Sequence, residues 1–168
     1  MKIYLTGFMS SGKTTIGRRL SYIIGYNFVD TDYFIEMQQD MTINDIFVKF
    51  GEAAFREMEH KLLIALQKHN NAVISTGGGM PCHNDNMDIM LANGTVVYLK
   101  TSPQALSQRL LRSYKERPLV NGKTEIELQK FIDEQLAIRE PIYNRANIVI
   151  DTENYSMENL LRMLNIKK

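Results

Sequence analysis

The stretch GFMSSGKTT, residues 7–15, constrains the fold of this chain more than any other part of its sequence. It follows an apolar run at residues 2–5 that is typical of a strand, and it leads into residues 13–24, whose apolar residues recur at helical spacing. The stretch matches the pattern G-x-x-x-x-G-K-[ST], in which a loop between a strand and a helix holds the phosphates of a nucleotide. The sequence therefore predicts a phosphate-binding loop, but the loop alone does not indicate where the terminal phosphoryl group goes.

Each part of this loop has a physical role in phosphate binding. Gly7 and Gly12 permit backbone torsions and close approaches that a side chain would obstruct. Backbone N–H groups point at the β-phosphate, the Lys13 ammonium can reach the β- and γ-phosphates, and the Thr14 hydroxyl can bind Mg²⁺. The alternative, a glycine turn that only happens to precede a helix, is disfavoured because the motif, the strand and the helix coincide. We therefore expect the nucleotide at Gly7, Met9, Ser10, Ser11, Gly12, Lys13, Thr14 and Thr15.

The composition favours one domain in a reducing compartment. A chain of 168 residues with 44% hydrophobic residues can bury one sizeable core. Its net charge of +1 gives no general attraction to nucleic acid or membranes, and its apolar runs fall far short of the ~20 residues that span a bilayer. Its single cysteine, Cys82, excludes an intramolecular disulfide. We expect a cytoplasmic monomer that binds neither nucleic acid nor a membrane.

Strand-like and helical segments alternate along the chain. Short apolar runs at residues 2–5, 28–29, 72–75, 95–99 and 148–150 are predicted strands. This alternation predicts an α/β fold, a three-layer α/β/α sandwich in which helices cover both faces of a five-stranded parallel sheet. Residues 33–68 are helical in pattern without a strand, and they are expected to form a helical insertion over the strand ends. Within it, Thr42 and Asp45 mark a helix start and Gly51 an interruption.

The last third of the chain has its own pattern. Residues 111–123 are polar and basic, contain Pro118 and Gly122, and are predicted to form a mobile loop between two helices. Residues 124–144 are a predicted long helix with Pro141 near its end. Residues 156–164 are a predicted last helix, with Ser156 as its cap.

Two carboxylates follow the second predicted strand, at the edge of the sheet where ligands bind in α/β folds. Asp30 and Asp32 are two residues apart, and strand alternation would aim both side chains the same way. One carboxylate can orient water on Mg²⁺, and the other can accept a proton from an acceptor hydroxyl. The alternative is that Asp32 only caps the following helix.

Two further groups of residues suit the binding of an acceptor. Arg56 and Glu59 share one helical face, although such a pair can also be a surface ion pair of little energetic weight. Gly77, Gly78 and Gly79 leave a bare backbone that a ligand can approach closely, although they can also form a plain turn.

Two arginines follow later in the chain. Arg117 belongs to the predicted loop, where an arginine can neutralise the transferring phosphoryl group, or can simply be solvated. Arg139 lies on the predicted long helix, and a buried arginine there would need an anionic partner.

The class of nucleotide enzyme can be narrowed by what the sequence lacks. It has no N-K-x-D signature for guanine. A motor ATPase would be larger and would place an aspartate after a hydrophobic strand, whereas the third predicted strand ends in Thr76 and three glycines. A small ATP-dependent phosphotransferase with an acceptor site remains.

The chain resembles shikimate kinase, a family of P-loop kinases in the nucleoside-monophosphate-kinase-like group. The matching segments are GFMSSGKTT, FVDTD, GEAAFREME, STGGGM, ERPL and IREPIYNRAN, in family order and over nearly the whole length. The resemblance implies a P-loop NTPase fold, with one domain over residues 1–168 that includes a substrate-binding segment at about 31–61 and a lid at about 112–124. It also implies that ATP phosphorylates the 3-hydroxyl of shikimate, a step of chorismate and aromatic amino acid biosynthesis.

The resemblance also implies roles for individual residues. Lys13 and Arg117 would contact the transferring phosphate, Asp32 would bind the acceptor hydroxyls and act as the base, and Thr14 and Asp30 would hold Mg²⁺, Asp30 through water. The shikimate site would comprise Asp32, Phe55, Arg56, Glu59, Gly77, Gly78, Gly79 and Arg139, with both arginines on the carboxylate.

The adenine contacts and the rival functions stay open at this point. The family often has an arginine where this chain has Leu110, so Arg109 or Arg112 would stack on adenine instead, near a loop at residues 151–154. A related small-molecule kinase such as a gluconate kinase would share the phosphate loop but would not need the Arg56 and Arg139 pair. A catalytically inactive nucleotide-binding module is the other alternative, and a nucleic-acid-binding protein is the weakest.

Overall fold

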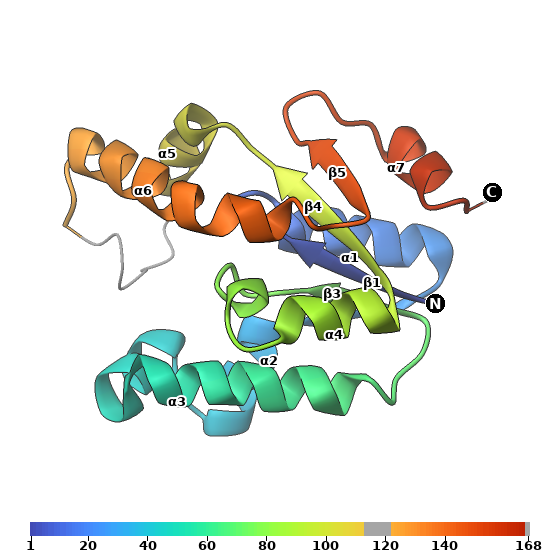
Figure 1. Cartoon of the computed structure of the whole chain (residues 1–168), viewed down its shortest axis with the longest axis horizontal. Helices are drawn as coiled ribbons and strands as arrows, with labels where there is room; N and C mark the ends of the chain where they lie inside the picture. Colours follow the sequence, from blue (N-terminus) through green and yellow to red (C-terminus); the bar gives the residue numbers. More distant parts are fainter. Residues whose placement is uncertain (113–121, 167–168) are drawn as a thin grey trace.

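The computed structural model describes residues 1–112 and 122–166, which build a parallel sheet with helices on both faces (Figure 1). The strand order is β2-β3-β1-β4-β5, and each neighbouring pair is parallel. The strands are β1 (Lys2–Thr6), β2 (Asn27–Asp30), β3 (Ala72–Ser75), β4 (Thr95–Lys100) and β5 (Ile148–Asp151). The predicted five-stranded α/β sheet is confirmed, and no strand end differs by more than one residue from its predicted position.

The helices of the described residues include all those that the sequence predicted. They are α1 (Lys13–Ile24), α2 (Thr31–Gln39), α3 (Ile43–Leu66), α4 (Asn86–Asn93), α5 (Pro103–Leu111), α6 (Glu125–Tyr143) and α7 (Met157–Met163), with a 3₁₀ turn, η1 (Met80–Cys82). Helix α4 and the turn η1 were not predicted. The N-cap of α4, Asp85, makes no side-chain capping bond.

The residues of the central strand alternate between two cores. Ile3 and Leu5 pack in one cluster with side chains of α1 and α7. Tyr4 points to the opposite face and packs with side chains of α3 and α4. Because successive side chains of a strand point to opposite faces, this alternation gives the sandwich its two buried faces. A third cluster joins α5 and α6 around Tyr98.

The predicted helical insertion is α2 and α3. Thr42 caps α3 in a capping box, in which its hydroxyl accepts a hydrogen bond from the Asp45 N–H at 3.1 Å. Gly51 interrupts α3 with φ 81° and ψ 170°, a left-handed torsion that glycine adopts at little cost. Figure 1 shows α3 at one end of the molecule and the pair of α5 and α6 at the other, with the sheet between them.

Local signals set the other helix ends, and the predicted Ser156 cap is confirmed. Gly25 ends α1 in the left-handed conformation, and Ser156 caps α7 by accepting from the Asn159 N–H. Thr124 caps α6 in a second capping box. Most of the predicted loop at residues 111–123, with Arg117 and Pro118, lies outside the described residues. Within the described ranges, no helix is both long and apolar enough to cross a membrane.

Candidate active site

A cleft of about 890 Å³ opens at the carboxyl ends of the strands, a volume typical of ligand sites. It brings together residues that lie far apart in the sequence. The predicted site residues that line it are Met9, Ser10, Ser11, Gly12, Lys13, Thr14, Thr15, Asp30, Asp32, Phe55, Arg56, Glu59, Gly77, Gly78, Gly79 and Arg139. Gly7 does not line it, and Arg117 lies outside the described residues.

The phosphate loop is tightly constrained between β1 and α1. Gly7 and Gly12 have φ values of 141° and 99°, and a Cβ on Gly7 would lie 2.7 Å from the Leu99 carbonyl oxygen. Glycine is therefore required at Gly7 by space as well as by torsion. The Lys13 Nζ donates to the carbonyl oxygens of Gly7 and Phe8 at 2.9 and 2.8 Å, which holds the ammonium over the loop.

Two hard oxygen groups meet beside the loop. The Thr14 hydroxyl donates to Asp30 Oδ2 at 2.7 Å, and Asp30 Oδ1 accepts from the Tyr33 N–H at 3.3 Å. In the part of the chain that the structure describes, no three His, Cys, Asp or Glu residues form a cluster that could hold a metal. A hydroxyl and a carboxylate at one point nevertheless fit Mg²⁺, which keeps several waters and takes few protein ligands.

The structure corrects the prediction about the geometry of the two aspartates. Strand β2 ends at Asp30 and α2 begins at Thr31, so Asp32 lies in the first turn of a helix and strand alternation does not apply. Asp30 caps this helix through the Tyr33 N–H, so the alternative that Asp32 is the cap is also wrong. Asp32 is half-buried and faces the cleft from the helix.

The segment Gly77, Gly78, Gly79 and Met80, here called the glycine turn, is approached closely by side chains of the chain itself. A Cβ on Gly77 would lie 2.6 Å from both Asp32 Oδ1 and Glu59 Oε1, and one on Gly79 would lie 2.4 Å from Arg56 Nη1. Gly78 has more room, because its nearest neighbouring atom would be 3.4 Å away. The bare backbone thus lets two carboxylates and a guanidinium pack directly against the turn.

Arg56 is held by two carboxylates of its own helix. Its Nη1 donates to Glu59 Oε2 at 2.7 Å and its Nη2 to Glu52 Oε1 at 2.9 Å. The Glu59 side chain is 1% exposed and that of Arg56 is 11% exposed, so the surface-pair alternative is wrong. Burial raises the pKa of Glu59 to about 7, against the opposing effect of the Arg56 charge. Phe55 packs beside Arg56, with the guanidinium 5.3 Å from the ring centroid.

Arg139 reaches the same cleft from α6. It is 8% exposed, and its guanidinium lies 5.7 Å from the centroid of the Phe8 ring. None of the salt bridges among the described residues involves Arg139. Glu52 and Glu59 act on the Arg139 charge only from beyond ion-pair distance. Burying a cation without a direct anionic partner is costly, so this end of the cleft is suited to an anionic ligand.

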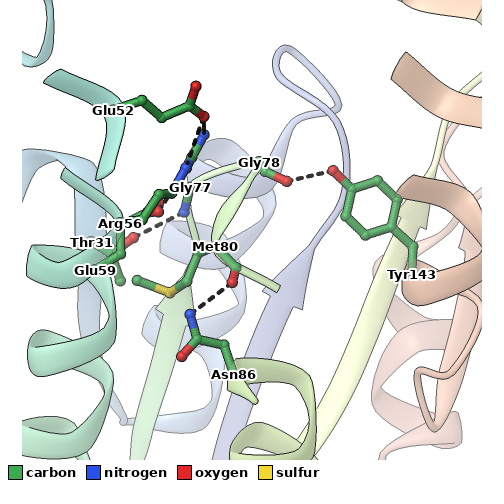
Figure 2. Close-up of polar contacts among 9 residues, drawn as sticks. All are labelled: Thr31, Glu52, Arg56, Glu59, Gly77, Gly78, Met80, Asn86 and Tyr143. Carbon is green, nitrogen blue, oxygen red and sulfur yellow. Dashed lines mark hydrogen bonds and ion pairs between the residues drawn. The ribbon is translucent and has the colours of Figure 1, made fainter. Parts of the chain in front are cut away.

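Sequence reasoning did not assign roles to three residues that hold the glycine turn (Figure 2). The Gly77 N–H donates to the Thr31 hydroxyl at 2.9 Å, the Tyr143 hydroxyl donates to the Gly78 carbonyl, and Asn86 Nδ2 donates to the Met80 carbonyl at 2.8 Å. Tyr143 has a sequence signal, because it lies four residues after Arg139 and therefore on the same face of α6. Thr31 and Asn86 have none.

Arg109 and Arg112, the two candidates for the adenine contact, differ in whether they line the cleft. Arg109 lines the cleft, and its Nη1 donates to the Ser10 carbonyl at 3.3 Å. Arg112 caps α5, is exposed and does not line the cleft. From the loop at residues 151–154, Thr152 alone contributes to the lining, and Tyr155 follows it.

The comparisons with known proteins agree in one family. A family model described as "Shikimate kinase" matches residues 9–165. A shikimate kinase from Parabacteroides distasonis is 42% identical over 94% of this chain and 91% of its own length. One from Clostridium botulinum, type A, is 40% identical over 99% of this chain and 95% of its own length.

Solved structures give the same result. A shikimate kinase from Bacteroides thetaiotaomicron matches with a TM-score of 0.94 and 35% identity over 99% of each chain. A shikimate kinase from Acinetobacter baumannii in complex with shikimate matches with a TM-score of 0.88 and 34% identity over 98% of this chain and 93% of the other. A gluconokinase from Sinorhizobium meliloti has a TM-score of 0.56 and 16% identity, which shows a shared fold alone.

Proposed function

The chain belongs to the shikimate kinase family, and from this premise we propose that it transfers the γ-phosphoryl group of ATP to the 3-hydroxyl of shikimate. The products are ADP and shikimate 3-phosphate, on the route to chorismate and the aromatic amino acids. The observation that carries the proposal is the placing of Arg139 and Arg56 in the same cleft as the phosphate loop. A carboxylate ligand suits two guanidinium groups, because their planar forks bind carboxylates in a bidentate way.

The donor half of the proposed site is the phosphate loop. Its backbone N–H groups and Lys13 hold the β- and γ-phosphates, and Arg109 takes the place beside adenine. Thr14 and Asp30 hold Mg²⁺, Asp30 through water, and the ion when bound neutralises charge on the phosphate oxygens. The contact between the Thr14 hydroxyl and Asp30 at 2.7 Å supports this pairing.

The acceptor half lies between α2, α3 and α6. The carboxylate of shikimate binds Arg139 and Arg56, while its hydroxyls face Asp32 and the N–H groups of the glycine turn. The 3-hydroxyl oxygen attacks the γ-phosphorus as the bond to the ADP oxygen breaks, and the hydroxyl proton passes to Asp32. Because phosphoryl transfer depends mainly on positioning and on charge stabilisation, these fixed groups supply most of what the reaction needs.

Closure and cellular context complete the proposal. We propose that residues 31–61 form a substrate-binding segment and residues 112–124 a lid that closes over both ligands and excludes water. The resemblance supports a role for Arg117 of this lid at the transferring phosphate. The net charge of +1 supports an enzyme that works without nucleic acid or a membrane, and the single cysteine suits the reducing cytoplasm. We also propose that it is a monomer.

The proposed function is tested by ADP release in a coupled assay with ATP and Mg²⁺. Shikimate should stimulate ADP release strongly, while gluconate and buffer alone should leave only slow hydrolysis. Stimulation by gluconate instead of shikimate would favour the related sugar-kinase function. Nucleotide binding without transfer to either acceptor would favour an inactive nucleotide-binding module.

A further inference from the structure

The glycine turn is held from three sides by helices that carry proposed acceptor-site residues or pack against them (Figure 2). Thr31 holds it from α2, next to Asp32, and Tyr143 holds it from α6, one turn after Arg139. Asn86 of α4 holds the Met80 carbonyl, and its own Oδ1 lies 2.7 Å from His60 Nδ1 on α3. The position of the turn is thus fixed relative to both arginine-bearing helices.

The contact with Tyr143 also fixes the direction of a peptide plane. The Tyr143 hydroxyl donates to the Gly78 carbonyl oxygen. In a planar trans peptide, the following N–H points opposite to the carbonyl, so the Gly79 N–H points away from Tyr143. In the same way, Gly77 O accepts from the Met80 N–H at 3.2 Å, which turns the Gly78 N–H away from the interior of the turn.

Both of these N–H groups are available to a ligand. Neither the Gly78 nor the Gly79 N–H donates to an acceptor on the described residues. Both glycines line the cleft. If the peptide between them flipped, the Gly78 carbonyl would take the direction that the Gly79 N–H has now, and a donor would be replaced by an acceptor.

The surroundings of Tyr143 hold its hydroxyl in place as a hydrogen-bond donor. It is 0% exposed, and its ring packs against that of Tyr98 with the centroids 5.1 Å apart. Burial raises the pKa of its hydroxyl well above the usual range, against the lowering effect of the charge and hydrogen bond of Arg139, so the group stays protonated and keeps its proton to donate. The packed ring leaves the hydroxyl little freedom to leave the Gly78 carbonyl.

We propose that Tyr143 is a positioning residue for the phosphoryl acceptor: its hydroxyl holds the Gly78–Gly79 peptide so that the Gly79 N–H faces the acceptor's hydroxyls. Because Tyr143 and Arg139 are four residues apart on α6, one helix sets both the turn and the guanidinium that binds the acceptor's carboxylate. The inference rests on the proposed function, because it takes shikimate as the acceptor.

The test is the substitution Tyr143→Phe, with Tyr98→Phe as the matched control. Phe keeps the ring and its packing in both variants. Tyr98 is 2% exposed in the same cluster, but its hydroxyl reaches Glu140 Oε1 at 3.5 Å and not the glycine turn. Tyr143→Phe should raise the KM for shikimate about tenfold, equivalent to about 1.4 kcal/mol, and leave the KM for ATP unchanged. Tyr98→Phe should leave both unchanged.

A second measurement uses the wild-type chain. Shikimate should shift the ¹H–¹⁵N resonances of the Gly78 and Gly79 amides and slow their exchange with solvent. In Tyr143→Phe the effect on the Gly79 amide should be lost, which separates loss of the contact with the turn from loss of the contact with Arg139. Unchanged amides in a chain that binds shikimate would overturn the inference, even if Tyr143→Phe did not fold.

The outcomes separate the inference from the proposed function. If the wild type does not phosphorylate shikimate, the proposed function fails, and the inference fails with it. The inference alone is overturned if the wild type is active and Tyr143→Phe has the same KM for shikimate as the wild type or as Tyr98→Phe. It is also overturned if Tyr143→Phe raises the KM values for shikimate and ATP in parallel.

Discussion

At the scale of single residues, Arg139 identifies the chemistry of the acceptor most directly. Arg56 is compensated by Glu52 and Glu59, so its burial has an internal explanation. Arg139 is 8% exposed and forms no salt bridge among the described residues, so Glu52 and Glu59 act on its charge only at longer range. Removing a buried charge from its direct partner costs on the order of several kcal/mol. We propose that the carboxylate of the acceptor supplies the direct anionic partner that Arg139 lacks among the described residues.

The substitution Arg139→Ala should raise the KM for shikimate about a hundredfold, since truncating one partner of a buried charge pair costs about 2–5 kcal/mol. The KM for ATP should change little, because the phosphate loop is intact. The control is Arg145→Ala, which removes an exposed arginine that pairs with Asp88 and should leave both constants unchanged. Equal increases in both KM values would show that Arg139 does not hold the acid.

The substitution Asp32→Asn should lower kcat about a hundredfold or more, because the variant cannot accept the proton of the attacking hydroxyl. The KM for ATP should stay near that of the wild type. Asp40→Asn is the matched control, since Asp40 is exposed at the end of the same helix and asparagine tolerates its left-handed torsion. Steady-state ADP release gives both values, and near-normal turnover by Asp32→Asn would rule out this residue as the base.

At the scale of elements, helix starts and breaks could be predicted because their causes are local. Thr42, Thr124 and Ser156 each accept a hydrogen bond from an N–H three residues later, and Gly51 breaks α3 by its own torsion. Such contacts join residues that are close in the sequence, so the helix starts can be predicted from the residue types alone.

Other elements depend on contacts between distant residues, and the sequence did not predict them. Helix α4 has Asn86 at its start, a fully buried residue that bonds Met80 and lies 2.7 Å from His60 of α3. Asp32 was placed on the wrong kind of element because β2 passes into α2 without a loop, and the residues between two such elements carry no boundary signal. The pairing of Glu59 with Arg56 was predicted. The burial of this pair was not, because it depends on the glycine turn that packs against both side chains.

Helix α3 should make stability depend on pH through Glu59. Its pKa is raised from 4.5 to about 7, mainly by burial, so the folded state binds a proton that the unfolded state releases. This stabilisation is fully present below about pH 4.5 and is lost as the pH rises through about 7. Relative to the wild type, Glu59→Gln should therefore gain on the order of 2–3 kcal/mol of unfolding free energy between pH 5 and pH 8.

Urea unfolding at the two pH values measures this gain. Glu57→Gln is the matched control, because Glu57 lies on the same helix with its side chain 55% exposed and should give no pH-dependent difference. A Glu59→Gln variant whose stability runs parallel to that of the wild type would show that the Glu59 carboxylate is not protonated in the fold.

At the scale of the whole molecule, the sheet order places the two halves of the proposed site side by side. Strand β1 is central, so the phosphate loop lies between the α2 and α3 insertion on one side and α5 and α6 on the other (Figure 1). The alternation of strands and helices predicted the sheet, but the meeting of Asp32, Gly77 and Glu59 within a few ångströms depends on long-range packing. The sequence motifs named these residues singly, and the fold brings them into one cleft.

The central claim is that this cleft passes the γ-phosphoryl group of ATP to one hydroxyl of shikimate. The most direct test is ³¹P NMR of the reaction with ATP, Mg²⁺ and shikimate, with ¹H–³¹P correlation to locate the new phosphomonoester. We predict one phosphomonoester for each ADP formed, correlated with the proton on carbon 3 of shikimate. Inorganic phosphate as the main product, or a phosphoryl group on another hydroxyl, would contradict the account.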